Sequence, residues 1–366
     1  NPESVLWDKL QSGLYPDTVY AYDSGGDPNE IPQLNQQEFI EFHKQYYHPS
    51  NAYIYLYGDG NIQEHLRYLQ THYLSQFQYK KIDTNIAFQR PPKAPLEKED
   101  LYSVNPGDSL QDKTFLSQAF SFGRAVDGEL KLAMDMLNYI VVGSESGPLK
   151  RALLDAKIGK EIWGYYYHSI QQPFYIITAK GANPDQKKEF QSIINKTLED
   201  LATNGIDPKL IEAAINTFEF SLREMDPGSS PKGLVYAHNI MPSWLNGGSP
   251  LAHLQFEPIL KKIKSQYNKG YFENIIRKNI LKNNFRLLYA LKPQEGLEEK
   301  SNQALVARLA QIKNSMSEQE IEKLMATSEK LKTKQSTPDT AENQAKLPIL
   351  TLKDVSVTPE VLPLEV

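Results

Sequence analysis

The chain carries Ser24-Gly25-Gly26-Asp27-Pro28 in its first loop and Tyr47-His48-Pro49-Ser50-Asn51 in its second. Glycine and proline at these positions predict turns rather than helix or strand. Between the two motifs, Asn35 and Glu38 have the spacing of a helix N-cap and its capping-box partner, which predicts a helix that ends just before the second motif. Aromatic and branched residues from Tyr53 to Tyr57 then predict a strand.

The remaining predicted elements alternate in the same way. Strands are predicted at residues 113–122, 163–167, 174–179 and 285–291, and helices at residues 4–14, 61–74, 128–140, 149–156, 184–201, 208–222, 299–313 and 318–332. Strands interrupted by helices, with tight turns between some strands, favour an α+β fold over a doubly wound parallel sheet. We therefore predict a mixed, mainly antiparallel sheet that is covered by helices and is followed by a helical hairpin.

The composition is that of a large protein with ordinary cores. Hydrophobic residues make up 40% of the chain, and the net charge of −5 is too small to indicate a nucleic acid or an anionic membrane as a partner. No apolar run approaches the roughly 18–20 residues of a membrane span. The chain has no cysteine, which excludes disulfides, thiolate metal sites and a cysteine nucleophile, and which suits the cytoplasm or an organellar matrix.

Changes in composition divide the chain into five parts. Arg90-Pro91-Pro92-Lys93-Ala94-Pro95 is too rich in proline for a helix or a central strand, so we expect an exposed, extended linker there. The expected parts are a first-domain segment at 1–82, a linker at 83–106, a second domain at 107–296, a helical connector at 297–346 and an extended lead at 347–366. Neither Asn1 nor the run from Thr358 to Pro363 resembles a natural terminus, so we expect both ends to be cut.

The closest approach to a zinc motif is Asn61-Ile62-Gln63-Glu64-His65. An inverted zinc-peptidase motif reads His-x-x-Glu-His, with two histidine ligands and a glutamate that activates water. Here asparagine replaces the first histidine, and an amide oxygen is a poor zinc ligand. We therefore interpret Asn61 as a helix cap and His65 as an ordinary helix residue. His72 lies on the same helix about 10 Å from His65, too far for both to bind one zinc ion.

No other group of residues has the spacing of a catalytic or metal site. We interpret His43 and His48 as packing and turn residues, and His238 and His253 lack an acidic partner at ligand spacing. The run Gly143-Ser144-Glu145-Ser146-Gly147-Pro148 lacks the lysine of a phosphate loop, so we interpret it as a turn between two helices. We predict no catalytic, cofactor-binding or metal-binding residue in this chain.

Two further groups could contact a ligand. Tyr165-Tyr166-Tyr167 alternates sides on a predicted strand, so a peptide-contacting surface is an alternative to ordinary sheet packing. Glu38 with Glu41, and Glu298 with Glu299, are carboxylate pairs on predicted helices, and we interpret both pairs as surface charge.

Several motifs together resemble one branch of a known enzyme family. The most specific are Leu14-x-Pro16-Asp17-x-x-Tyr20 before the first loop motif and Phe42-His43-x-x-Tyr46 before the second. Ser146-Gly147-Pro148-Leu149 and Met241-Pro242-Ser243-Trp244-Leu245 add to them. These stretches resemble the pitrilysin/insulinase-type zinc metallopeptidases, in particular the presequence protease branch that includes falcilysin. The resemblance spans nearly the whole chain.

The resemblance implies that residues 1–82 form the second half of a first peptidase domain and that residues 107–296 form a complete, non-catalytic second domain. It places the zinc ligands and catalytic residues outside this chain, so zinc would belong to the parent protein. The parent would enclose unfolded or short peptides in a clamshell chamber and cut them with zinc-activated water. This segment would supply chamber wall and connector, with peptide substrates and the rest of the same polypeptide as its partners. The alternative is a non-catalytic peptide-binding or scaffold homologue of the same fold.

The first segment, up to about residue 78, offers only one predicted strand and about three helices. A sheet needs roughly three strands to be stable by itself. We therefore expect this segment to be the least stable part of the chain unless an upstream half, the second domain or another molecule holds it. Apolar residues such as Leu56, Leu66 and Leu69 would otherwise face water.

Overall fold

The computed structural model of the chain describes residues 1–355. These residues fall into two compact units, one formed by residues 1–297 and one that begins at Glu298. The first unit contains a five-stranded sheet, and the described part of the second is helical.

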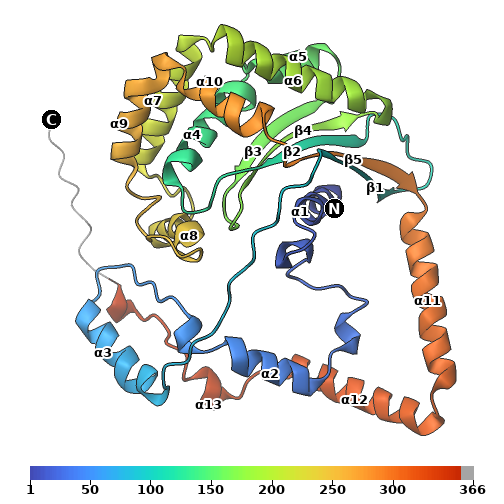
Figure 1. The fold of residues 1–366 in the computed structure, drawn as a ribbon. Coiled ribbons are helices and arrows are strands. Elements are labelled where there is room, and N and C mark those ends of the chain that lie inside the picture. The colour runs from blue at the N-terminus through green and yellow to red at the C-terminus, as the bar shows by residue number, and fades with distance from the viewer. Residues whose placement is uncertain (356–366) are drawn as a thin grey trace. The chain divides into compact units, whose positions relative to one another are not determined.

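The sheet forms the centre of the first unit (Figure 1). Its strands are β1 (Leu96–Val104), β2 (Thr114–Ser121), β3 (Glu161–Tyr167), β4 (Phe174–Ala182) and β5 (Arg286–Glu295). They are arranged in the order β1-β5-β2-β4-β3, in which β1 runs parallel to β5 and every other neighbouring pair is antiparallel. The prediction of an α+β fold with a mixed, mainly antiparallel sheet is confirmed.

Helices cover one face of this sheet. They are α4 (Gly128–Asn138), α5 (Pro148–Asp155), α6 (Lys187–Asn204), α7 (Pro208–Glu224), α9 (Phe256–Gln266) and α10 (Tyr271–Ile275), while α8 (Lys232–Trp244) lies between α7 and α9 in the chain. Phe190, Ile194 and Leu198 recur at helical spacing on α6 and are buried. They share one core with Leu116 of β2 and Ile177 of β4.

The other face of the sheet is covered by α1 (Pro2–Leu14). Asn1 caps this helix, because its side-chain oxygen accepts a hydrogen bond of 3.0 Å from a backbone N–H of the first turn. Leu6, Leu10 and Leu14 recur every four residues and are at most 2% exposed. They form a second core with residues of β2, β4 and β5. The sequence analysis grouped α1 with the residues up to 82, whereas its apolar contacts are with the sheet.

Polar contacts fix the end of α1 and the segment that leads to β1. The buried hydroxyl of Tyr15 donates to the carbonyl oxygen of Gln172 at 2.6 Å. The Gln89 side chain donates to the Asp17 carboxylate at 2.8 Å and accepts from the Asp17 backbone N–H at 2.9 Å. The Gln172 side chain in turn accepts from the Gln89 N–H at 2.6 Å and donates to the Gln89 carbonyl at 3.0 Å. We call these four residues the glutamine clamp.

Residues 36–79 contain two helices that bury no side chain within the described structure. The first, α2 (Gln36–Tyr46), begins with the predicted capping box of Asn35 and Glu38, and the second is α3 (Ile62–His72). Large apolar side chains on both helices are exposed, namely Phe39, Phe42, Ile62, Leu66 and Tyr68. These helices therefore have amphipathic sequences but no core of their own.

The predicted strand at Tyr53 to Tyr57 is wrong. These residues pair with no strand and are 37–56% exposed. The physical reason is that a strand needs a neighbour for its backbone hydrogen bonds, and none lies beside them. Instead, the ring of Tyr53 packs on Trp244 and the ring of Tyr57 on Tyr236, with ring centroids 4.5 Å and 5.5 Å apart.

The sequence analysis also missed β1, which lies inside the predicted linker at 83–106. Acidic and basic residues fill the middle of this edge strand, so its sequence lacks the apolar alternation of a half-buried strand. Lys187 of α6 pairs with two of the acidic residues, Glu97 and Glu99. The run from Arg90 to Pro95 has no helix or strand and is mostly exposed, as expected.

The second unit has two long helices. Its described elements are α11 (Leu297–Ser315), α12 (Glu318–Ser336), α13 (Ala341–Gln344) and a short turn at Leu352–Asp354. The capping box of Ser317 and Glu320 at the start of α12 is present. Residues 356–366, including the run from Thr358 to Pro363, lie outside the described residues, and the five domain boundaries stay predictions. No helix within residues 1–355 is long and apolar enough to cross a membrane.

Replacing Leu10 by alanine should lower the free energy of unfolding by about 2–5 kcal/mol, because it leaves a cavity between α1 and the sheet. Leu34→Ala is the matched control: Leu34 is 62% exposed, so the change should stay within about 0.5 kcal/mol. Chemical denaturation followed by circular dichroism measures both. Equal, small effects would show that α1 does not complete the core.

Limited digestion with trypsin should cut after Lys80 or Lys81 before it cuts after Lys98. The first two residues are exposed in a stretch without helix or strand, whereas Lys98 pairs with Tyr289 inside the sheet. Mass spectrometry of the first fragments identifies the sites. Early cleavage after Lys98 would contradict the pairing of β1 with β5.

Candidate functional site

Within residues 1–355, no three histidine, cysteine, aspartate or glutamate side chains lie close enough together to hold a metal ion. The stretch from Asn61 to His65 shows the reason. The side-chain oxygen of Asn61 accepts hydrogen bonds from the backbone N–H groups of Gln63 at 3.0 Å and Glu64 at 3.3 Å. Asn61 is therefore the N-cap of α3, as predicted, and His65 is an exposed residue of the same helix. These residues do not fit a zinc ion.

The other histidines near the start of the chain have structural roles. The ring of His43 stacks on Tyr47 with centroids 4.6 Å apart. The Nδ1 atom of His48 accepts a hydrogen bond of 3.1 Å from the Ser50 backbone N–H. The interpretation of both as packing and turn residues is confirmed. His238 is exposed on α8.

The glycine-rich run at 143–148 is a turn between helical segments, as predicted. It joins the π-helical turn Tyr139–Gly143 to α5. A Cβ atom on Gly147 would lie 2.7 Å from the carbonyl oxygen of Val141, so glycine is required for this close approach. The hydroxyls of Ser144 and Ser146 lie 3.3 Å apart and bond to each other.

The three consecutive tyrosines of β3 divide between the faces of the sheet. Tyr166 lies in the helix-covered core, and its hydroxyl donates to the Phe122 carbonyl at 3.2 Å. Tyr165 and Tyr167 lie on the α1 side, where both contact Trp7. Sheet packing therefore accounts for Tyr166 and Tyr167. Tyr165 remains 44% exposed on an edge strand.

The carboxylate pairs singled out in the sequence serve their own helices. Glu38 completes the capping box of α2, and Glu41 accepts a hydrogen bond from Gln37 one turn earlier. On α11, Glu299 accepts from Gln303 at 3.2 Å. None of these contacts brings two acids together around a substrate.

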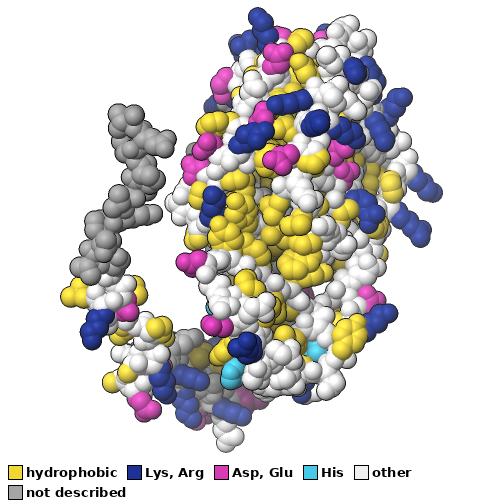
Figure 2. Space-filling view, turned by 90° about the vertical axis from the view of Figure 1, so that its left-hand side faces the viewer, with side chains coloured by type: hydrophobic (Ala, Val, Ile, Leu, Met, Phe, Trp, Pro, Cys, Tyr) yellow, Lys and Arg dark blue, Asp and Glu magenta, His cyan; other side chains and the backbone are white. Residues whose placement is uncertain are grey.

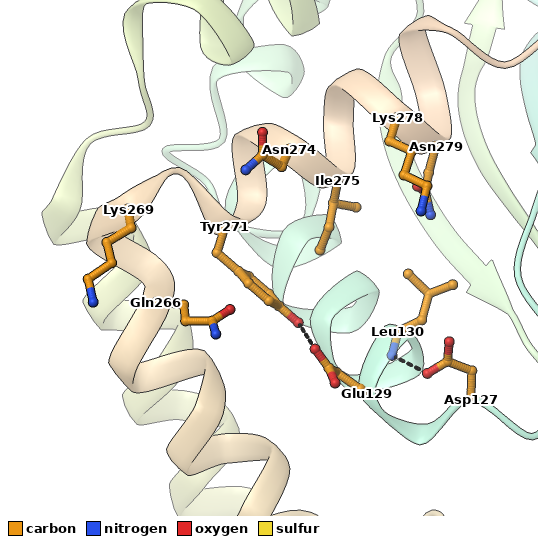
Figure 3. A pocket seen from close by; sticks show the side chains of 10 residues that line it. All are labelled: Asp127, Glu129, Leu130, Gln266, Lys269, Tyr271, Asn274, Ile275, Lys278 and Asn279. Carbon is orange, nitrogen blue, oxygen red and sulfur yellow. Dashed lines mark hydrogen bonds between the residues drawn. The ribbon is translucent and has the colours of Figure 1, made fainter.

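A hollow of about 540 Å³ opens between the start of α4 and the region of α9 and α10 (Figure 3). It is lined by Asp127, Glu129, Leu130, Gln266, Lys269, Tyr271, Asn274, Ile275, Lys278 and Asn279. Both acids already have partners. Glu129 accepts hydrogen bonds from the Tyr271 hydroxyl at 3.1 Å and from Lys262 at 2.7 Å, and Asp127 accepts from the Leu130 N–H at 2.9 Å.

The chemistry of this hollow is structural. Burial and the neighbouring Glu129 carboxylate raise the pKa of Tyr271, so its hydroxyl stays a hydrogen-bond donor. The ten lining residues include no serine, cysteine or histidine, and thus no nucleophile beside a base. The contacts of Glu129 hold α4 against α9 and α10.

Large apolar side chains also reach the surface on α7 and α8. Phe220 is 68% exposed, Leu234 49% and Leu245 60%. Figure 2 shows hydrophobic side chains gathered in the middle of one face of the molecule. Such a patch is typical of a surface that contacts another protein segment.

The sequence analysis missed one pair of titratable groups. His168 lies beside His253, with ring centroids 5.6 Å apart and planes inclined by 66°. Burial lowers the pKa of both rings, that of His168 to about 4. The two residues are far apart in the sequence and lie in loops without a periodic pattern, so no signal in a single sequence pairs them.

Comparison with solved structures identifies the fold. The chain resembles an M16-like peptidase from Alicyclobacillus acidocaldarius with a TM-score of 0.59 at 16% identity, covering 80% of this chain and 66% of that chain. It resembles a peptidase M16 inactive domain from Pseudomonas fluorescens with a TM-score of 0.59 at 14% identity and the same coverage. The sheet with its two helical coverings is therefore an M16-type peptidase fold.

Sequence comparison gives the family. Residues 33–218, just over half of the chain, match the family described as peptidase M16 inactive domain. Residues 291–365 match a second family, which is described as a region associated with a subgroup of the same peptidases. The chain thus belongs to the M16 peptidase family, and the resemblance to pitrilysin-type peptidases is confirmed.

Two curated relatives match the whole chain. It is 42% identical to Protein HypA of Clostridium perfringens and 33% identical to Presequence protease 1, chloroplastic/mitochondrial, of Arabidopsis thaliana. In each case all of this chain is covered, but only 38% and 34% of the relative. The chain therefore spans little more than a third of the length of these relatives.

The purified chain should hold well under one zinc ion per molecule after dialysis, because its described histidines and acids form no set of three ligands. Elemental analysis measures the zinc content. The His65→Ala variant is the control, since His65 belongs to the nearest approach to a motif. One tightly held zinc ion that disappears in His65→Ala would contradict this account.

Proposed function

We propose that this chain is part of a zinc-dependent metalloendopeptidase that degrades unfolded or short peptides inside a clamshell chamber. In this proposal the chain supplies chamber wall and connector, and the zinc site and catalytic residues belong to the rest of the parent polypeptide. Membership of the M16 family and the relatives named presequence proteases support it.

The observation that carries the proposal is the state of residues 36–79. They have helix caps, amphipathic helices and a strand-like run at Tyr53 to Tyr57, yet they bury no side chain on α2 or α3. A sequence with these features requires a sheet to complete it. We infer that upstream residues of the parent supply strands that pair with Tyr53 to Tyr57 and make a first peptidase domain.

The proposed chamber wall is the α1 side of the sheet with its edge strand β3. The outer edge of β3 pairs with no other strand in the described residues, and Tyr165 beside it is exposed. An extended peptide can add to such an edge through backbone hydrogen bonds. The same feature supports the second candidate, a peptide-binding or scaffold homologue without catalysis.

The proposed partners are peptide substrates and the remaining parts of the same polypeptide. We propose neither a nucleic acid nor a membrane as a partner, because the net charge is only −5. The proposed compartment is an organellar matrix or the cytoplasm. Relatives named mitochondrial or chloroplastic presequence proteases support the first, and the absence of cysteine from the sequence is compatible with both.

The test uses the parent polypeptide and this chain, purified separately. The parent should hydrolyse an unstructured peptide, lose activity with a chelator and regain it with zinc, while the chain alone should not. In the parent, Leu56→Asp should lower activity about tenfold or more, because it places a charge in the inferred sheet. Leu347→Asp is the control, since Leu347 is 67% exposed.

Two outcomes would separate the candidates. A parent that binds the peptide without cutting it, with or without zinc, would support the scaffold and overturn the peptidase. A parent in which Leu56→Asp behaves like Leu347→Asp would overturn the inferred pairing of Tyr53 to Tyr57.

A further inference from the structure

Three loops meet at one end of the sheet. They are the β2–α4 loop at 122–127, the β3–β4 loop at 168–173 and the α8–α9 loop at 245–255. The first two are joined by backbone hydrogen bonds, from the Phe122 N–H to the Pro173 carbonyl at 3.1 Å and from the Ala125 N–H to the Gln171 carbonyl at 3.3 Å. The third loop packs closely on the first. A Cβ atom on Gly248 would lie 2.7 Å from the Val126 side chain.

His168 and His253 bring the second and third loops together at this junction. Nε2 of His253 lies 2.7 Å from the carbonyl oxygen of Ala125. A carbonyl only accepts, so Nε2 carries the proton and Nδ1 of the neutral ring has the lone pair. The Nδ1 atoms of both histidines are buried and have no hydrogen-bond partner within the described residues.

We propose that His168, His253 and the Ala125 carbonyl form an acid-sensitive latch, which holds the α8–α9 loop on the β2–α4 loop while both rings are neutral. Protonation would place an N–H at a buried position without an acceptor, beside a second ring that gains the same charge. The α8–α9 loop would then separate from the junction before the sheet unfolds.

The charges that face the pair favour the neutral rings only in part. On α4, the ammonium group of Lys131 disfavours protonation of both histidines, whereas Asp127 and Asp135 favour it for His253. Lys131 is itself paired with Asp135 at 2.8 Å. On β3, the Tyr166 carbonyl favours the charged form of His168. The cavity of about 430 Å³ beside His253 adds Arg223, Glu224, Lys232 and Glu257.

Burial outweighs these opposing charges, and the pKa of each ring lies below its ordinary value near 6.5. The unfolded or opened chain therefore binds more protons than the closed one. The stability that the neutral pair contributes is complete above about pH 6.5 and is lost as the pH falls toward about 4.

The latch is close to the glutamine clamp. Gln172 of the clamp belongs to the β3–β4 loop, and the Arg124 guanidinium lies over the Phe88 ring at 5.4 Å. The Gln171 N–H also donates to the Tyr20 hydroxyl at 3.0 Å. Opening the junction would therefore loosen the attachment of the segment before β1.

The test follows the chain from pH 7.5 to pH 4 with 5-fluorotryptophan and ¹⁹F NMR. Trp244 lies directly before the α8–α9 loop, whereas Trp7 and Trp163 lie on the α1 side of the sheet. The Trp244 resonance should change first, with a midpoint between about pH 4 and 6.5. In His168→Gln/His253→Gln, which cannot take up these protons, the midpoint should fall by about one pH unit.

His238→Asn is the matched control, because His238 is exposed on α8, and it should keep the wild-type profile. If the double variant does not fold, histidine ¹⁵N shifts of the wild-type chain report the protonation of each ring directly. Ordinary titration of both rings near pH 6.5 would overturn the proposal. So would a Trp244 change that coincides with those of Trp7 and Trp163, or one that the double variant leaves in place.

Discussion

The apolar contact between α1 and the sheet is the interaction on which the rest of this structure depends. A sheet has two faces, and the helices α4 to α10 cover only one of them. Leu6, Leu10, Leu14 and Tyr15 cover the other. Each such side chain contributes about 1.5–3 kcal/mol when it is fully buried. Without α1, apolar residues of three strands would face water.

This contact determines how the chain is divided. The helix that comes first in the sequence belongs to the core of a sheet whose strands begin at Leu96. The glutamine clamp then fixes both ends of the intervening segment, near Asp17 and near Gln89. Residues 36–79 lie between these two points and contribute nothing to either core. They resemble a closed loop of chain that waits for a sheet of its own.

The sequence predicted the parts of the fold that are encoded locally. Helix starts at Asn35, Asp207 and Ser317 depend on neighbouring residues, and all three are present. The run from Tyr53 to Tyr57 failed because strand formation depends on a partner as well as on residue type. The edge strand β1 was missed because its charged residues hide the alternation. The capping role of Asn61 was predictable, whereas the approach of His168 to His253 depends on the packing of distant loops.

Hydrogen–deuterium exchange of the isolated chain, followed by mass spectrometry, tests the central claim most directly. The account predicts that α1 exchanges as slowly as β2 and β4, because the three elements share one core. It predicts that α2, α3 and the run from Tyr53 to Tyr57 exchange much faster. Strong protection of residues 36–79 in a monomer, or rapid exchange of α1 while β2 and β4 stay protected, would contradict it.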